Sequence, residues 1–217
     1  EKVKVIYPGI SLTRSHLALQ GETLQGFPDP YILYLGTLEP RKNIEGLIQA
    51  FEIFCKKVPP LPNPSPSRGE GRVRVDLVIA GRPGWLYNSI YRAVAQSPAR
   101  SRIRLIGPID EQYKAALYRG ASLFVYPSFY EGFGFPPLEA ASYGVPVVTS
   151  ASSSLPEVIG DAALLIDPTN VADMAEGMQR ILEDKQLRDT LSIQGKACAA
   201  RFSWEKCAKE IIELFSQ

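Results

Sequence analysis

The chain has 217 residues, of which 45% are hydrophobic and 22% charged, and this balance is typical of a globular protein that buries a core. Its formal net charge of +1 excludes a basic surface spread over the whole chain for nucleic acid or anionic membranes. No apolar run approaches the ~20 residues of a membrane-spanning helix, and no signal-peptide pattern starts the chain.

The three cysteines lack CxxC spacing. They predict reduced thiols and a cytoplasmic location rather than a disulfide framework. For a longer parent protein, a peripheral position at the inner face of the membrane is compatible with that location. The first residue, Glu1, is not methionine, and we therefore expect a fragment or a trimmed chain.

The first 30 residues predict a lead-in to the main domain. Residues 2–7 alternate apolar and polar side chains, which predicts a short strand, and Pro8-Gly9 predicts a turn after it. Residues 11–30 show no regular pattern. His16 is the sole histidine of the sequence, and we interpret it as structural or incidental.

The main domain begins with a continuous apolar run at residues 31–36, as expected for a strand buried on both faces of a sheet. A loop at 37–42 follows, and Asn43 is a candidate N-cap for a helix over 43–57. Residues 58–72 then interrupt the pattern, because the stretch 59–71 contains five prolines and two glycines. We interpret it as a solvated, disordered insertion without helix or strand, and a proline-rich partner motif is the alternative.

After the insertion, strands and helices alternate almost to the end of the chain. The predicted strands are 73–80, 102–107, 123–126, 146–149 and 162–166. The predicted helices are 86–97, 110–119, 136–143, 152–158, 170–183, 185–200 and 203–216. Such alternation predicts an α/β domain over 31–202, with a Rossmann-like doubly wound parallel sheet of about six strands and helices on both faces. In this architecture ligands bind beyond the carboxyl ends of the strands. The loops to inspect are therefore 37–42, 81–85, 107–110, 127–135 and 150–155.

Within these loops, Gly132-Phe133-Gly134 lies between a strand and a helix. Glycines let the backbone approach a ligand closely, and consecutive free N–H groups can cradle an anion at the positive end of the helix dipole. Pro136 and Pro137 suit the first helical turn, where a missing N–H costs little. A tight turn without a ligand is the alternative, because this short pattern is common.

Two carboxylates, Glu131 and Glu139, bracket the glycines. Carboxylates accept hydrogen bonds from hydroxyl groups, so this pair suits a ligand with sugars on both sides of a diphosphate. An acid–base pair for glycoside hydrolysis is one alternative, and a helix-surface charge is another for Glu139. The phosphate-friendly loop between them favours polyol binding.

Arg41 and Lys42 follow the first strand of the domain at the same predicted edge. Two cations there can neutralise a diphosphate, both when it is bound and when it departs. A solvated pair of loop charges is the alternative. The sequence has no Asp-x-Asp and no His, Cys and carboxylate spacing typical of a metal site, so we expect no metal and no other cofactor.

These motifs together resemble the C-terminal half of retaining, nucleotide-sugar-dependent glycosyltransferases of the family 4 type, which have the GT-B architecture. The resemblance covers about residues 31–215. Its most specific parts are Gly-Thr-Leu-Glu-Pro-Arg-Lys-Asn at 36–43, Glu-Gly-Phe-Gly-Phe-Pro-Pro-Leu-Glu-Ala at 131–140, and Gly-Val-Pro-Val-Val at 144–148; Ser-Leu-Pro-Glu-Val at 154–158 and Phe-Ser-Trp at 202–204 are also similar to the family.

The resemblance implies roles for individual residues of a donor site. Glu131 would hold hydroxyls of the donor sugar, and Arg41 and Lys42 would bind and stabilise the departing diphosphate. Further residues are implied to contact other parts of the substrate. Ile109 would lie near the base, and Leu138 and Glu139 near the ribose. The remaining implied contacts are Gly36, Thr37, Gly132 and the backbone of Phe133 and Gly134. Many relatives have arginine where this chain has Thr37, so we expect phosphate binding to rely more on Arg41.

The resemblance also implies partners. The donor-binding domain would face an N-terminal acceptor domain that this sequence lacks, with residues 1–30 as the connection and 203–217 as a crossover helix. The expected substrates are a nucleotide sugar, with GDP-mannose favoured over UDP-sugars, and a glycan or lipid-linked acceptor; no nucleic-acid partner is expected. The chain by itself would bind the donor but transfer it poorly. The alternatives are a non-catalytic nucleotide- or partner-binding module, and a UDP-sugar-using transferase, an epimerase or a phosphorylase of the same architecture.

Overall fold

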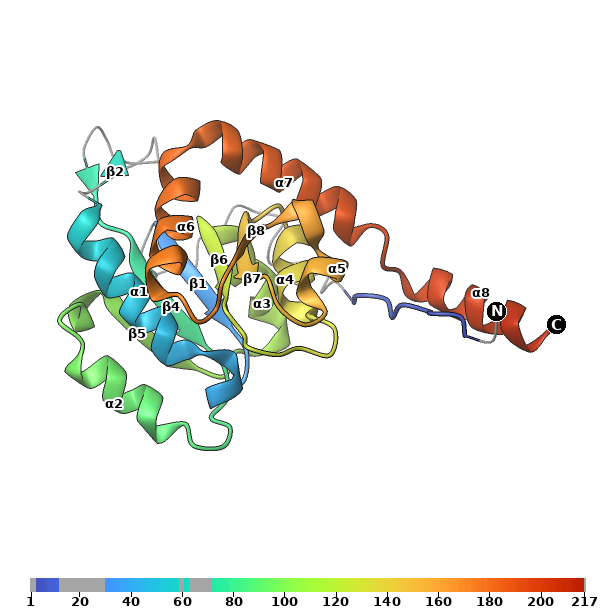
Figure 1. The fold of residues 1–217 in the computed structure, drawn as a ribbon, viewed down its shortest axis with the longest axis horizontal. Coiled ribbons are helices and arrows are strands. Elements are labelled where there is room, and N and C mark those ends of the chain that lie inside the picture. Colours follow the sequence, from blue (N-terminus) through green and yellow to red (C-terminus); the bar gives the residue numbers. More distant parts are fainter. Residues whose placement is uncertain (1–2, 12–29, 59–60, 63–71, 217) are drawn as a thin grey trace.

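The computed structural model describes residues 3–11, 30–58, 61–62 and 72–216. Figure 1 shows a layered α/β domain from which both ends of the chain leave on the same side. Its central sheet has six strands: β1 (Tyr31–Leu35), β4 (Asp76–Ala80), β5 (Ile103–Gly107), β6 (Leu123–Tyr126), β7 (Val147–Ser150) and β8 (Leu164–Ile166). All neighbouring pairs are parallel, in the order β5-β4-β1-β6-β7-β8. The predicted doubly wound parallel sheet is confirmed.

The strand order places a switch point at β1. From β1 the chain proceeds outward through β4 and β5, and it then returns to place β6 on the other side of β1. Ile32 lies opposite Leu77 on one side and Leu123 on the other, and all three side chains are fully buried. A crevice opens beyond the carboxyl ends of the strands at such a reversal, so the loops after β1 and β6 are brought together.

Helices cover both faces of the sheet. The helices are α1 (Ile44–Lys57), α2 (Asn88–Gln96), α3 (Glu111–Gly120), α4 (Phe135–Ser142), α5 (Leu155–Val158), α6 (Val171–Glu183), α7 (Lys185–Ala199) and α8 (Trp204–Phe215). On one face α1 packs against both α2 and α6 (Figure 1). On the other face α3 meets α4, because the ring of Tyr118 stacks on that of Tyr143 at 5.5 Å between centroids. α7 packs along α4.

Side-chain caps fix where the last three helices begin. Asn170 accepts hydrogen bonds from the backbone of the first turn of α6, Asp184 accepts from Leu187 at 2.9 Å, and Ser203 accepts from Lys206 at 3.1 Å. These short polar side chains satisfy N–H groups that have no partner within the helix. Asn43 stands at the predicted N-cap of α1, but its side chain donates to the carbonyl of Pro168 at 2.7 Å instead.

Two sequence-based predictions of local structure are wrong. The strand predicted near residues 2–7 does not form, because residues 3–11 have neither strand nor helix structure. An alternating segment becomes a strand only with a partner, and among the described residues this segment makes one backbone hydrogen bond to the domain, from Ile10 to Phe202. The insertion was predicted to contain no strand. In the structure β2 (Leu61–Pro62) pairs with β3 (Arg72–Val73) in antiparallel fashion, so two short strands lie at the two ends of the insertion. The rest of the predicted insertion, and His16, lie outside the described residues.

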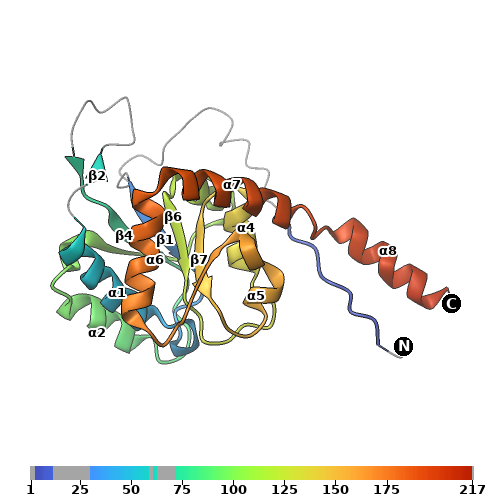
Figure 2. The ribbon, with the colours of Figure 1, turned by 45° about the horizontal axis from the view of Figure 1, so that its top comes forward.

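The N-terminal segment and α8 leave the domain together (Figures 1 and 2). The Trp204 indole N–H donates to the Ser11 hydroxyl at 3.0 Å, which ties the two at their base. Gly9 has no room for a side chain, since a Cβ there would lie 2.2 Å from the backbone nitrogen of Trp204. Within the described residues, no helix is both long enough and apolar enough to cross a bilayer.

Candidate functional site: two loops at the switch point

The loop after β1 is built on its neighbours. Residues Pro40–Lys42 form one 3₁₀ turn, and the carbonyl of Arg41 accepts two hydrogen bonds from the loop after β6, from Phe129 N–H at 2.9 Å and from the Ser128 hydroxyl at 3.1 Å. On its other side, Leu38 bonds through its backbone to Arg82 and Gly84, in the loop after β4. Hydrogen bonds to the loops after β4 and β6 therefore hold the backbone of the loop that carries the predicted site residues.

The backbone of Gly36, the first residue after β1, lies very close to that of Gly81, the first residue after β4. A Cβ on Gly81 would lie 1.8 Å from the carbonyl oxygen of Gly36, and Gly81 also has a φ of +146°, which side chains rarely adopt. Close approach of the two loops therefore requires glycine at 81. Thr37 is half-buried beside them, and its carbonyl accepts a hydrogen bond from the Tyr34 hydroxyl at 3.2 Å.

Arg41 and Lys42 meet Glu131 across the switch point. The Lys42 ammonium nitrogen lies 2.5 Å from Oε1 of Glu131, and an Arg41 guanidinium nitrogen lies 3.3 Å from Oε2. Arg41 also pairs with Glu39 at 2.7 Å and donates to the carbonyl of Tyr130 at 2.6 Å. The structure thus brings Arg41 and Lys42 of the loop after β1 together with Glu131 of the loop after β6. With Glu39 they form an ion cluster (Glu39, Arg41, Lys42 and Glu131).

The burial of this ion cluster is uneven. Side chains of Lys42 and Glu131 are 8% and 9% exposed, whereas that of Arg41 is 39% exposed. Burial by itself would raise the pKa of Glu131, but hydrogen bonding by Lys42 and Ser128 and the charges of Lys42 and Arg41 outweigh it, so the pKa of Glu131 lies below its ordinary value. Glu131 is therefore ionised, and Arg41 presents the accessible positive charge of the ion cluster.

Two tyrosines that the sequence analysis did not single out form the floor of the ion cluster. The rings of Tyr34 and Tyr126 stack at 5.8 Å between centroids, and the Tyr126 hydroxyl accepts a hydrogen bond from Lys42 at 2.6 Å. Burial, followed by the nearby charge of Glu131, raises the pKa of Tyr126, so it stays a neutral partner. The sequence did contain a sign of them, because Tyr34 and Tyr126 each carry a hydroxyl group within an otherwise apolar strand, and a buried tyrosine hydroxyl usually has a hydrogen-bond partner.

The glycine loop (132–134) presents unused backbone donors. Within the described residues, the N–H groups of Gly132, Phe133 and Gly134 donate to no protein acceptor. The Ser154 hydroxyl instead holds the loop by its carbonyls, bonding those of Glu131 and Phe133 at 3.0 and 2.9 Å. These free donors lie at the start of α4, where the helix dipole is positive, as an anion site requires.

The two glycines of the loop have different reasons to be there. Gly134 has a φ of +105°, and a Cβ on it would lie 2.6 Å from Cδ2 of Leu155. Gly132 has open space where a Cβ would be. The backbone conformation of the loop therefore depends on Gly134, while Gly132 leaves room on the solvent side.

The remaining predicted residues lie around this centre at different depths. The Glu139 carboxylate on α4 is held by Lys114 at 2.9 Å and by the Tyr118 hydroxyl at 3.0 Å, both on α3, so it is no solvated surface charge. Ile109 is half-buried directly before α3. Leu138 is fully buried, so in this structure it supports the site from the core and offers no surface to a ligand.

No group of His, Cys, Asp and Glu that could hold a metal ion occurs among the residues that the structure describes. The available positive charges in the site come from Arg41 and Lys42 and from the backbone dipoles of the glycine loop. Independence of metals and cofactors stays a prediction.

Comparison with known proteins agrees with this geometry. Residues 24–198 match the model of the family described as "Glycosyl transferases group 1". The chain is 42% identical over 185 residues to O-antigen chain mannosyltransferase B of Escherichia coli, covering 85% of this chain and 45% of that protein. It is 35% identical over 190 residues to the serotype-specific mannosyltransferase WbdA of Escherichia coli, covering 88% of this chain and 22% of that protein.

Solved structures show the same fold. Sucrose-phosphate synthase of Thermosynechococcus elongatus matches with a TM-score of 0.71 and 28% identity, over 87% of this chain and 45% of that one. Anabaena Alr3699/HepE, solved in complex with UDP, matches with a TM-score of 0.71 and 20% identity, over 86% of this chain and 48% of that one. The chain thus spans less than half the length of each of these proteins.

Proposed function

Because this chain belongs to the glycosyl transferases of group 1 and has the fold of a GT-B domain, we propose that it is the donor-binding domain of a hexosyltransferase. Its ligand would be a nucleoside diphosphate sugar bound at the switch point. The observation that carries this proposal is the free N–H groups of residues 132–134 at the start of α4, beside the accessible guanidinium of Arg41. Backbone donors, a helix dipole and a cation directed at one place suit a diphosphate.

In the proposed complex the two cations have different tasks. Arg41 meets the diphosphate directly, exchanging part of its contact with Glu39 and Glu131 for phosphate oxygens. Lys42 is buried between Glu131 and Tyr126, so it keeps the Glu131 carboxylate ionised and in place.

During transfer, negative charge grows on the departing nucleoside diphosphate. Donors that are already oriented toward this charge stabilise the transition state more than the ground state. We assign that work to Arg41 and the backbone of residues 132–134 by direct contact, and to the charge of Lys42 from its buried position beside Glu131. The sugar is transferred with retention of its anomeric configuration. In this assignment Glu131 accepts hydrogen bonds from sugar hydroxyls, Glu139 from ribose hydroxyls, and Ile109 meets the base.

The donor we propose is GDP-mannose, with a glycan or lipid-linked acceptor. The first relatives that the chain resembles are named as mannosyltransferases, which favours a mannosyl donor. The chain spans 45% of O-antigen chain mannosyltransferase B, so the acceptor and the full reaction belong to a larger protein in this proposal. By itself the chain would bind the donor and transfer it poorly.

Isothermal titration calorimetry with GDP and UDP tests the proposal. Wild type should bind GDP more tightly than UDP. Arg41→Met should weaken GDP binding about 10- to 150-fold, since a charged hydrogen bond contributes roughly 1.5–3 kcal/mol. Arg104→Met is the matched control, because Arg104 also forms an exposed ion pair, with Asp76. Asp76 is the first residue of β4, so this pair lies at the amino-terminal ends of the strands, away from the site.

The outcomes separate the parts of the proposal. Equal GDP affinity in Arg41→Met and wild type would overturn the phosphate assignment. Tighter binding of UDP than of GDP would favour a UDP-sugar donor. Binding of neither nucleotide would favour a non-catalytic, partner-binding module.

A further inference from the structure

Tyr7, in the N-terminal segment, lies against the glycine loop. Its ring centroid is 6.3 Å from that of Phe133 and 5.8 Å from that of Phe202, which it meets edge to face. Its hydroxyl donates a hydrogen bond to the carboxylate of Glu157 on α5. A residue far away in the sequence therefore contacts the middle of the candidate anion site, and neither the proposed donor contacts nor the core explain it.

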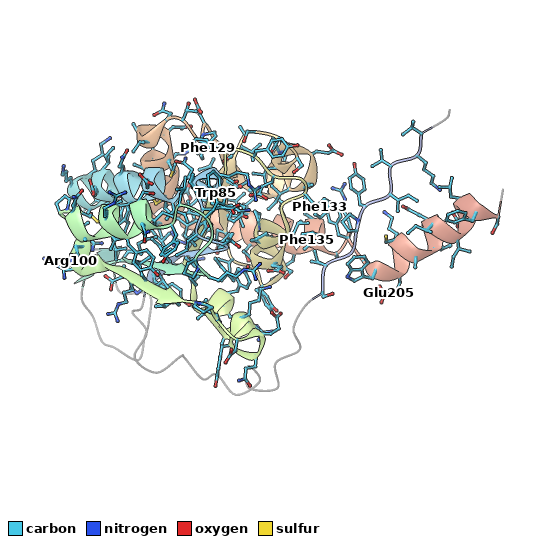
Figure 3. The ribbon with its side chains drawn as sticks, turned by 90° about the horizontal axis from the view of Figure 1, so that it is seen from below. Trp85, Arg100, Phe129, Phe133, Phe135 and Glu205 are labelled. Carbon is cyan, nitrogen blue, oxygen red and sulfur yellow. The ribbon has the colours of Figure 1, made fainter. Side chains whose placement is uncertain are left out.

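Phe133 is the centre of an aromatic cluster (Tyr7, Phe133, Phe135 and Phe202). Its ring lies 4.9 Å from that of Phe135 and 5.5 Å from that of Phe202. Figure 3 shows Phe133 and Phe135 on the side of the domain next to the N-terminal segment. Aromatic rings at these distances attract one another beyond the burial of their area, so the cluster restrains the Phe133 side chain.

The backbone around Tyr7 is fixed without help from its side chain. Ile10 donates its N–H to the carbonyl of Phe202 at 3.1 Å, and Gly9 passes so close to Trp204 that no side chain fits. These contacts set where the segment leaves the domain. The side chain of Tyr7 is thus held in a defined place relative to Phe202 and is available to hold something else.

What Tyr7 holds is the glycine loop, through a ring contact that is separate from the serine contacts of the loop. Ser154 bonds the carbonyls of Glu131 and Phe133, and α5, which carries Glu157, begins directly after Ser154. Tyr7 therefore contacts both the loop, through Phe133, and the element that supports the loop, through Glu157. Without the tyrosine, this link between the two would be absent.

We propose that Tyr7 is a positioning residue for the glycine loop, holding Phe133 and α5 so that the N–H groups of residues 132–134 face a bound diphosphate. This inference deepens the proposed function and rests on it for the identity of the ligand. Tyr7 touches no reacting atom, so its effect is on the geometry of the loop.

Two readouts test the role. The first is the backbone order of residues 132–134 in the ligand-free chain, from ¹⁵N relaxation, and the second is GDP affinity by calorimetry. Wild type should show order parameters of about 0.85, and Tyr7→Ala should lower them below about 0.6. GDP affinity of Tyr7→Ala should fall about tenfold. Tyr7→Phe keeps the ring contact with Phe133 but loses the hydrogen bond to Glu157, so both readouts should lie between those of wild type and Tyr7→Ala.

The control variant is Val5→Ala, an exposed apolar position in the same segment, which should change neither readout. Since 38% of the Tyr7 residue is exposed, its variants should fold, and a cooperative urea unfolding transition confirms this. Unchanged loop order in folded Tyr7→Ala would overturn the inference, and so would a disordered loop with unchanged GDP affinity. If wild type binds neither GDP nor UDP, the proposed function fails, while the order parameters still decide whether Tyr7 holds the loop.

Discussion

Replacing Lys42 by methionine should destabilise the fold by about 3 kcal/mol. The pair it breaks joins atoms 2.5 Å apart, with side chains 8% and 9% exposed. Breaking a buried pair by removing one partner costs roughly 3–5 kcal/mol, because the other charge remains without compensation. Arg41, at 3.3 Å from the same carboxylate, compensates in part, which places the cost near the lower end of that range.

Urea unfolding of Lys42→Met and wild type measures this difference. For a domain of this size, about 3 kcal/mol corresponds to a lowering of Tm by roughly 6–12 °C. Lys185→Met is the matched control, because Lys185 pairs with Asp189 at 2.6 Å but its side chain is 80% exposed. That exposed pair should contribute about 0.3–0.5 kcal/mol. A loss below 1 kcal/mol for Lys42→Met would refute the reasoning from burial.

The double variant Lys42→Met/Glu131→Gln identifies the cause. With both charges removed, no unpaired buried charge remains, so the double variant should be more stable than the sum of the two single changes predicts, by about 2 kcal/mol.

The pH dependence of stability provides a second check. Because the pKa of Glu131 is lower in the folded chain than its ordinary 4.5, its contribution is complete above that value and is lost as the pH falls through the lowered folded pKa. The stability advantage of wild type over Glu131→Gln should shrink in that acidic range and stay constant above it.

Gly134→Ala should destabilise the chain by about 1–2 kcal/mol in urea unfolding, because alanine is strained at the φ of +105° and its Cβ meets Leu155. Gly132→Ala, with open space at its Cβ, should stay within about 0.5 kcal/mol of wild type, and equal losses at the two positions would contradict this distinction. Burial raises the pKa of the Cys198 thiol and also that of Cys55, so both should react slowly with a disulfide reagent at pH 8 in the native chain and quickly in urea. Rapid reaction of native Cys198 would show that its surroundings open.

The sequence predicted the elements around the site better than the contacts within it. Apolar runs and helical periodicity identified the strands and helices that flank the site, and the residue types of the loops indicated phosphate and hydroxyl chemistry. The sequence could not indicate that Glu139 is held by Lys114 and Tyr118, because Glu139 lies on α4 and both partners lie on α3. It also gave Leu138 a ligand contact, whereas its burial places it in the core.

The sequence by itself determined the order of strands and helices and the loops that carry glycines and charges. These properties depend on neighbours within a few positions, whose spacing sets helix and strand periodicity. The tertiary structure decided which charges meet. Lys42 and Glu131 are 89 positions apart, and they touch because β6 pairs beside β1 at the switch point. Tyr7 likewise meets Phe133 because the N-terminal segment packs beside the start of α8, a contact between distant parts of the chain that no local pattern encodes.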